Sequence, residues 1–267
     1  MPGRGARRGT QGGGQTGRVT TSVVLLLALL VVGGAAAGNE RVLPWSGGAN
    51  HVTPIEGALS RVAQSLAGDA AAVRCVSPGD WRALGARHRF DARLTWAMTP
   101  LVRDPGSPTR PDGNSMFAPR TCRLLAAFTA APAERGTRIC RHESSSGRSI
   151  LGECDGWGTS LVGLHVLGHE SVHLAGVVDE ATADCLAMQL DALVAMQLGA
   201  SPAFARRLAR DYWAQYYPAQ ELEYRSPQCR DGGSLDLFRV DGWPTPRRYP
   251  ARIAPALERF TIPSPGH

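Results

Sequence analysis

The chain has 267 residues, 43% of them hydrophobic, and its formal net charge of +6 comes from arginine alone, since it contains no lysine. This size and apolar content are sufficient for one domain with a buried core. Because the arginines are scattered among acidic residues and form no basic stripe with interleaved aromatics, the composition argues against nucleic-acid binding.

The first 38 residues differ in composition from the rest. Residues 1–20 hold four arginines, no acidic residue and many glycines, which predicts a basic disordered tail. Residues 21–38 are uncharged and rich in Val, Leu and Ala, as in a transmembrane anchor or a signal segment, and Ala35-Ala36-Ala37 is compatible with cleavage. Because the arginines precede this segment, the rest of the chain is expected outside the cytoplasm. We therefore expect a single-pass membrane protein with an extracytoplasmic C-terminal domain, or a secreted protein if the segment is cleaved.

Residues 39–52 are rich in Gly, Pro and polar side chains and are expected to form a stalk, followed by one domain over residues 53–267. A capping box at Thr53 and Glu56 predicts a helix that ends at Gly68. The next expected elements are a short strand, a stretch of short strands and turns, a helix, and a Gly- and Ser-rich loop, at residues 71–76, 81–117, 120–130 and 134–157. Within the stretch of short strands and turns, Asn114–Ala118 is a candidate strand for binding an extended substrate.

Three helices are predicted after the loop. The central one is capped at Thr159 or Ser160 and stops at Gly176. The second begins near Asp179 and Glu180 and stops at Gly199, and the third runs from Ser201-Pro202 to a point before Pro218. Gly163 and Gly168 are costly inside the central helix, so they predict close packing against neighbouring elements.

Six cysteines form an even set in a chain that is expected to be exported, where disulfides persist. They are Cys75, Cys122, Cys140, Cys154, Cys185 and Cys229. No C-x-x-C pair is present, which argues against a zinc ribbon or a thioredoxin-type redox pair. The pattern predicts a disulfide-braced domain, and our single suggested pair is Cys185 with Cys229.

The chemistry-bearing motif is His169-Glu170-Ser171-Val172-His173, on the predicted central helix. Residues four apart share a helix face, so His169 and His173 can both bind one metal ion. Zinc suits two imidazoles, a carboxylate and an open fourth position. Glu170 is then beside the metal as the general base that takes a proton from the activated water.

The third ligand is Asp179 or Glu180, and two family resemblances bear on the choice. Residues 169–179 resemble the extended motif of the snapalysin-like metzincins, which implies Asp179. Residues 180–187 resemble the second-helix motif of gluzincins, which implies that Glu180 is the ligand and that Asp184 hydrogen-bonds His169. We favour Glu180, because Asp179 suits the N-cap of the second helix.

Two further groups lie near the motif. His165 is one turn before His169, and we expect it to meet solvent or a carbonyl rather than the metal. Tyr212, Tyr216 and Tyr217 could donate to an oxyanion, but an aromatic stripe at helical spacing is more often core.

Together these features predict an α+β, predominantly α, zincin-like domain with an HExxH helix, a following ligand helix and a small β region. The resemblance implies a membrane-tethered or secreted metallopeptidase with Zn²⁺ and a peptide or protein substrate. The alternative is a catalytically silent zincin-fold domain that serves extracytoplasmic interactions. Metal content and hydrolysis distinguish the two.

Overall fold

The computed structural model describes residues 52–68, 70–102, 110–130, 141–143, 149–151, 157–239 and 242–261. The expected tail (1–20) and the expected anchor or signal segment (21–38) lie outside these residues, as does the stalk except for its last residue. Among the described residues, no helix combines the length and apolarity needed to cross a membrane. The described part is rich in helix and has only small sheets, which agrees with the predicted α+β class.

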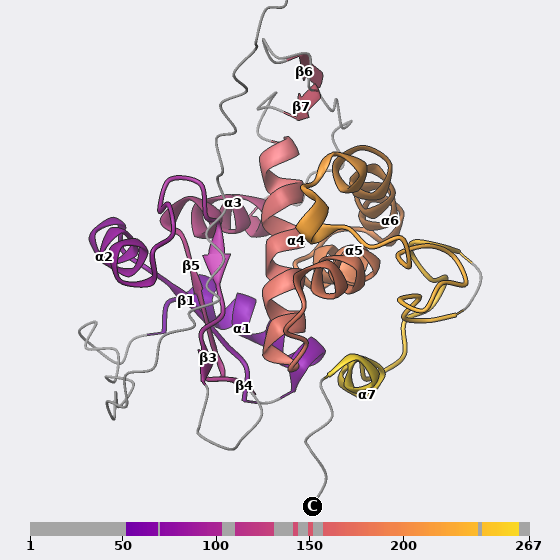
Figure 1. The fold of residues 1–267 in the computed structure, drawn as a ribbon, viewed down its shortest axis with the longest axis horizontal. Helices are drawn as coiled ribbons and strands as arrows, with labels where there is room; N and C mark the ends of the chain where they lie inside the picture. Colours follow the sequence, from indigo (N-terminus) through magenta and orange to yellow (C-terminus); the bar gives the residue numbers. More distant parts are fainter. Residues whose placement is uncertain are drawn as a thin grey trace, which may run out of the picture.

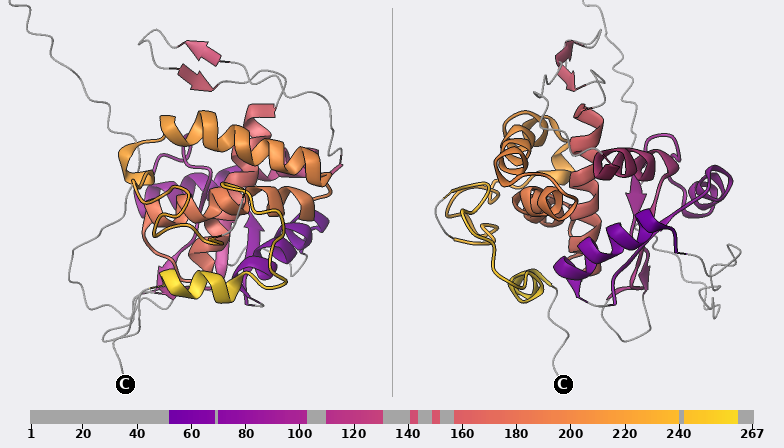
Figure 2. Two further views of the ribbon diagram at one scale, coloured as in Figure 1. Left: turned by 90° about the vertical axis from the view of Figure 1, so that its right-hand side faces the viewer. Right: turned by 180° about the vertical axis from the view of Figure 1, so that it is seen from behind.

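A single helix, α4 (Trp157–Leu174), runs through the centre of the molecule (Figure 1). On one side it packs against α5 (Glu180–Gln197), which α6 (Pro202–Asp211) covers in turn (Figure 2). On the other side it packs against α1 (Pro54–Ala67) and α3 (Pro119–Ala130). Apolar side chains from all five helices form one buried core, so α4 is held in place from both sides.

The main sheet has three short strands in the order β1, β5, β2. β5 (Asn114–Phe117) is parallel to β1 (Ala72–Cys75) and antiparallel to β2 (Ala97–Met98). β1 pairs with β5 along its whole length, and β2 pairs with Met116 and Phe117 on the other edge. Neighbouring strands therefore occupy most of β5, and the suggestion that Asn114–Ala118 binds an extended substrate stays a prediction. In the described part of this sheet, the strands with a free edge are β1 and β2.

Four further strands form two small antiparallel pairs. β3 (Leu101–Val102) pairs with β4 (Arg110–Pro111), and β6 (Arg141–Glu143) pairs with β7 (Ser149–Leu151). The second pair lies within the segment expected to be a loop, residues 134–157. Cys140 and Cys154, which belong to that segment, are outside the described residues.

The predicted N-terminal helix is confirmed as α1, with the predicted capping box. Thr53 and Glu56 exchange hydrogen bonds between side chain and backbone, and Glu56 also accepts a hydrogen bond of 2.8 Å from the backbone of Cys75. The same carboxylate therefore caps α1 and fixes the end of β1. Burial raises the pKa of Glu56, but these hydrogen bonds outweigh it and the net pKa is lowered.

Helix α2 (Pro78–His88) corrects our expectation of only short strands and turns from Trp81 to Phe117. Ser77 caps it by accepting a hydrogen bond from the backbone of Asp80. Its buried apolar side chains, Trp81 and Leu84, join a small separate core. So few apolar positions give no sustained helical period, which explains why the pattern was not recognised.

The predicted C-terminal end of the central helix is confirmed, but its predicted start is wrong. α4 begins at Trp157, so Thr159 and Ser160 lie inside its first turn and neither is its N-cap. Gly176, just after the end of α4, has a φ of 98° that favours glycine. A Cβ on Gly168 would lie 3.6 Å from the Cβ of Ala187 on α5, and one on Gly163 would lie 3.7 Å from Leu125 on α3. The predicted close packing at both glycines is confirmed, and at Gly168 it brings α5 against the motif.

After α6 the chain makes a π-helical turn, η1 (Tyr212–Tyr216), and two 3₁₀ turns, η2 (Tyr217–Ala219) and η3 (Leu222–Tyr224). It ends with α7 (Ala254–Leu257) and η4 (Glu258–Phe260). The suggested disulfide between Cys185 and Cys229 is confirmed, and it ties this C-terminal region to α5. A second disulfide joins Cys75 on β1 to Cys122 on α3.

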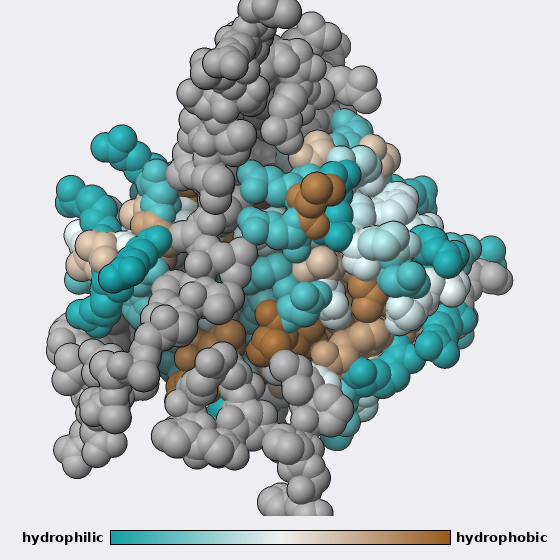
Figure 3. Space-filling model, viewed as in Figure 1, coloured by the Kyte–Doolittle hydropathy of each residue, from teal (hydrophilic) through white to brown (hydrophobic). Residues whose placement is uncertain are grey.

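Hydrophilic residues cover most of the described surface in Figure 3, with smaller hydrophobic areas in front of the lower half of α4. The exposed large apolar side chains belong to separate segments: Val52, Leu94, Leu101 and Leu222. Leu222, on η3, is the most exposed of them at 80%. Isolated apolar side chains of this kind are normal on soluble domains and identify no interface by themselves.

Candidate metal centre

Three side chains meet where α4 ends and α5 begins. The Nε2 atoms of His169 and His173 are 2.9 Å apart, and Glu180 Oε2 is 3.1 Å from the first and 3.3 Å from the second. The side chains of His169 and His173 are 11% and 9% exposed, while the Glu180 side chain keeps 31% of its surface exposed. The three potential ligand atoms therefore converge on one point that solvent reaches from the side of Glu180.

The donor set fits a metal ion. In tetrahedral zinc sites with bonds of about 2.0–2.1 Å, neighbouring ligand atoms lie roughly 3.3 Å apart, close to the separations of these three atoms. Two imidazole nitrogens and one carboxylate oxygen also match the ligand types that zinc prefers, and leave a fourth position for water or substrate.

The ring of His173 is oriented by a backbone contact. Its Nδ1 is 2.6 Å from the carbonyl oxygen of Val177, so Nδ1–H donates to that oxygen and the lone pair of Nε2 faces the other ligand atoms. Burial lowers the pKa of His173, but Glu180 and then Glu170 outweigh it and raise that pKa to about 9. Burial likewise raises the pKa of Glu180, and the two histidines reverse this and hold it well below its usual value. The site therefore attracts positive charge.

Of the two carboxylates considered for the third ligand, the structure brings Glu180 to the histidines. Asp179 instead caps α5, accepting a hydrogen bond of 2.8 Å from the backbone N–H of Thr182. The first turn of α5 thus separates the two roles: one residue ends the loop and the next faces α4.

Asp184, which the gluzincin resemblance pairs with His169, lies one turn further along α5. Its Oδ1 is 3.8 Å from His169 Nδ1, which is an ion-pair distance and too long for a hydrogen bond. Its short contact is with His165 Nε2, at 2.9 Å. The described residues offer no hydrogen-bond partner to His169 Nδ1 or to Asp184 Oδ2, although both atoms are buried.

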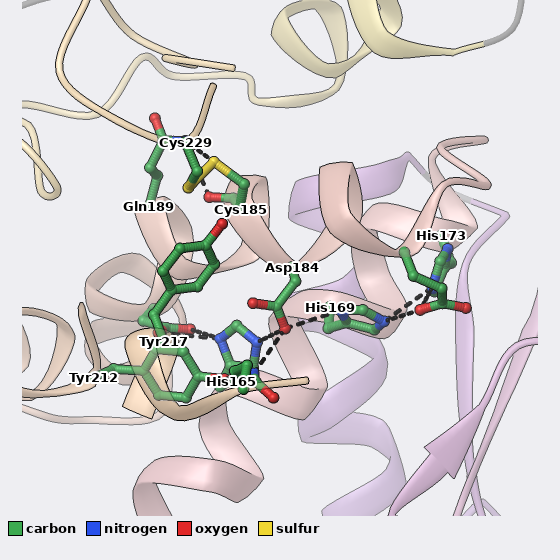
Figure 4. Close-up of polar contacts among 12 residues, drawn as sticks. His165, His169, His173, Asp184, Cys185, Gln189, Tyr212, Tyr217 and Cys229 are labelled. Atoms are coloured by element: carbon green, nitrogen blue, oxygen red, sulfur yellow. Dashed lines mark hydrogen bonds and ion pairs between the residues drawn. A yellow bond between two sulfur atoms is a disulfide. The ribbon is translucent and has the colours of Figure 1, made fainter. Parts of the chain in front are cut away.

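The expectation that His165 meets solvent or a carbonyl is wrong. The residue is 3% exposed and lies between two carboxylates, with Nε2 at Asp184 and Nδ1 3.2 Å from Asp191 Oδ1. Its ring stacks on Tyr212 with centroids 3.9 Å apart (Figure 4). Burial lowers the pKa of His165, but Asp191 and Asp184 outweigh it and raise that pKa to about 10. The imidazole is therefore a buried cation at neutral pH.

Glu170, the expected general base, is held by two hydroxyl groups from the sheet region. Thr99 Oγ1 donates to Glu170 Oε2 at 2.6 Å, and Ser115 Oγ lies 3.4 Å from the same oxygen. Ser115 is fully buried on β5, and Thr99 follows β2 directly. Among the described residues, Glu170 Oε1 has no hydrogen-bond partner, so this oxygen is available to accept a proton.

The tyrosines expected from the sequence are mainly core, and a different tyrosine reaches the site. Tyr212 and Tyr217 are buried, whereas Tyr224 on η3 is half-buried with its ring centroid 6.2 Å from that of His169. Burial raises the pKa of Tyr224, and so do Glu180 and Glu223, which leaves its phenol protonated at neutral pH. Next to it, an open pocket is lined by residues of one short segment: Gln220, Glu221, Leu222, Glu223 and Arg225.

Five of these groups were not predicted from the sequence: Thr99, Ser115, Asp191, Gln220 and Tyr224. Asp191 had a usable signal, because an Asp in the interior of an otherwise apolar helix face requires a buried partner. The other four are polar residues in short strands or turns, where no pattern distinguishes them from surface residues.

A scan against protein-family models and searches of curated proteins and of solved structures give no match to this chain. The assignment of the site therefore rests on the geometry and chemistry of its own residues.

Proposed function

We propose that this chain is a zinc-dependent metallopeptidase of zincin type. The observation that carries the proposal is the convergence of His169 Nε2, His173 Nε2 and Glu180 Oε2 within 3.3 Å of one another. Zinc held by these atoms supplies a Lewis acid that makes water nucleophilic near neutral pH. The expected N-terminal segment would place this activity outside the cytoplasm, on a membrane anchor or as a secreted domain.

Glu170 is the proposed general base. The Thr99 hydroxyl fixes Oε2, which limits rotation of the carboxylate and leaves Oε1 to take a proton from the attacking water. The same oxygen then returns that proton to the amine that leaves when the peptide bond breaks. Because Ser115 belongs to the central strand β5, the position of Glu170 is coupled to the main sheet.

Tyr224 is the proposed donor to the oxyanion that forms as water adds to the carbonyl. Its ring centroid is 6.2 Å from that of His169, it keeps its proton at neutral pH, and it lies on the segment that lines the open pocket. A fixed O–H donor that meets charge only in the transition state lowers the barrier without tightening substrate binding.

The test begins with a measurement of the metal content of the full chain, purified with its disulfides intact. The same measurement is made on Glu170→Gln, on His173→Ala and on a matched control, Glu258→Gln, which lies on the exposed turn η4. We expect about one zinc per chain in all but His173→Ala. Glu170→Gln should keep zinc but lose about 10²- to 10⁴-fold of the hydrolysis of an internally quenched peptide library. The control should retain both properties.

Zinc binding without hydrolysis of any peptide in the library would favour the alternative function, a catalytically silent extracytoplasmic interaction domain. Wild-type protein that takes up no zinc, even when zinc is supplied during refolding, would contradict the peptidase proposal and leave an exported interaction domain.

A further inference from the structure

Behind the metal centre lies a buried polar chain that the proposed reaction does not use. It runs from Asp191 through His165 to Asp184 and ends opposite His169. Figure 4 labels the last three of these residues. Asp191 is 1% exposed, His165 3% and Asp184 2%, so water screens none of these charges. Burying two carboxylates and an imidazole inside a core costs free energy through desolvation, which indicates that their arrangement has a role.

Each link in the chain fixes the next. Asp191 accepts from Nδ1–H of His165, which leaves Nε2–H to donate to Asp184 Oδ1. Tyr212 stacks on the imidazole and prevents it from tilting. Gln220 holds Asp184 from the other side, donating to Oδ1 at 3.1 Å and to the Tyr212 hydroxyl at 2.7 Å.

The result is a carboxylate with one oxygen occupied and one free. Oδ1 of Asp184 receives both hydrogen bonds, while Oδ2 has no partner among the described residues. The buried Nδ1 of His169 also lacks a partner and lies 3.8 Å from Oδ1. An imidazole that binds metal through Nε2 must carry its proton on Nδ1, and a carboxylate placed opposite Nδ1 stabilises that tautomer.

We propose that His165 is a positioning residue that, held between Asp191 and Asp184, fixes Asp184 opposite His169 and thereby sets the metal affinity of the site. This inference rests on the proposed zinc function and assigns a role to a histidine and an aspartate outside the ligand set. His165 takes this role through the contacts of its two ring nitrogens with carboxylates. The potential ligand atoms of His165, His169 and Asp184 also lie within 4.8 Å of one another, so the number of bound metal ions separates positioning from ligation.

The test compares zinc affinity in the full chain and in His165→Gln, Asp191→Asn and Gln220→Leu, by competition with a chromophoric chelator. The matched control is Gln189→Leu, which changes a side chain on α5 that is 1% exposed and removes its hydrogen bonds to Leu235 and Leu237. Among the described residues, the hydrogen bonds of the Gln189 side chain involve no member of the polar chain. Outer-shell changes of this kind weaken binding about 10- to 100-fold. We expect that loss in His165→Gln and Asp191→Asn, a smaller loss in Gln220→Leu, and wild-type affinity in the control.

A second readout separates positioning from general loss of stability. In protein loaded with Co²⁺ instead of zinc, the visible absorption bands report ligand geometry, and they should shift in His165→Gln but not in Gln189→Leu. If His165→Gln does not fold, Gln220→Leu, at the edge of the chain, still tests the inference.

The possible outcomes are distinguishable from those of the proposed function. Wild-type zinc affinity and an unshifted Co²⁺ spectrum in the folded variants would overturn the inference while leaving the metallopeptidase proposal intact. Two zinc ions per chain, one of them lost in His165→Gln, would also overturn it, because His165 would then be a ligand. Wild-type protein that binds no zinc would overturn both.

Discussion

Replacing Asp179 or Glu180 by alanine tests whether Asp179 caps α5 while Glu180 binds the metal. Asp179→Ala removes the cap on Thr182 and should cost about 1 kcal/mol of stability, with zinc affinity unchanged. Glu180→Ala removes one of the three proposed ligand side chains, so zinc affinity should fall by more than the roughly 100-fold expected for residues that only contact a ligand.

The difference in zinc affinity between the two variants can be measured in denaturant titrations, as the increase in the free energy of unfolding that zinc causes. At a zinc concentration about 1,000 times the wild-type Kd, bound metal should stabilise the native state by about 4 kcal/mol. A variant with 100-fold weaker binding retains only about 1.4 kcal/mol under the same conditions. Asp179→Ala should show the full zinc effect on a less stable background, and Glu180→Ala little of it. The opposite result, in which zinc stabilises Glu180→Ala but not Asp179→Ala, would refute the ligand assignment.

Three further predictions concern the disulfide of α5, the proton on His165 and the hydroxyl of Tyr224. Replacing Cys185 and Cys229 by alanine should cost about 4 kcal/mol in urea unfolding, because the bridge closes a loop with a sequence separation of 44; no change in the midpoint would contradict this. The free energy of unfolding of the zinc-loaded wild type should fall by on the order of 1 kcal/mol per pH unit between about pH 7 and 10. The reason is that His165 in the native protein keeps its proton up to a pKa of about 10, whereas His165 in the unfolded chain releases it near a pKa of about 6.5. His165→Gln should show a flatter profile. Tyr224→Phe should lower kcat about tenfold or more with KM and zinc content unchanged, and an unaltered kcat would exclude the proposed donor.

The parts of the site that could be predicted from sequence have local causes. Glycine after the last helical turn at Gly176, a short capping carboxylate at Asp179 and four-residue spacing between His169 and His173 each act within one or two helical turns. Because the loop between α4 and α5 is short, it also determines which residue of the second helix can face the first. These signals specify the helix pair that carries the potential ligands.

The parts that were missed depend on contacts between distant segments. Helix α2 buries only a few apolar side chains, so its cap at Ser77 was the only strong signal for it. The position of β5 between two strands depends on pairing with β1 and β2, which residue patterns in such short strands do not specify. His165 was misjudged because its partners, Asp184 and Asp191, lie on another helix.

This division between local and distant contacts affects how function can be inferred. The potential ligands lie within twelve residues, from His169 to Glu180, and their arrangement follows from two helices and the turn between them. The groups proposed to hold the base and to stabilise the transition state, Thr99 and Tyr224, come from segments that only the tertiary fold brings to the site. The proposal therefore expects a chain that kept these two helices but lost Thr99 and Tyr224 to keep its metal affinity and to hydrolyse peptides slowly. The proposed metal binding can be argued from the two helices and the turn between them. The proposed hydrolysis depends in addition on residues from distant segments, and it is at those residues that an active peptidase would differ from a silent domain.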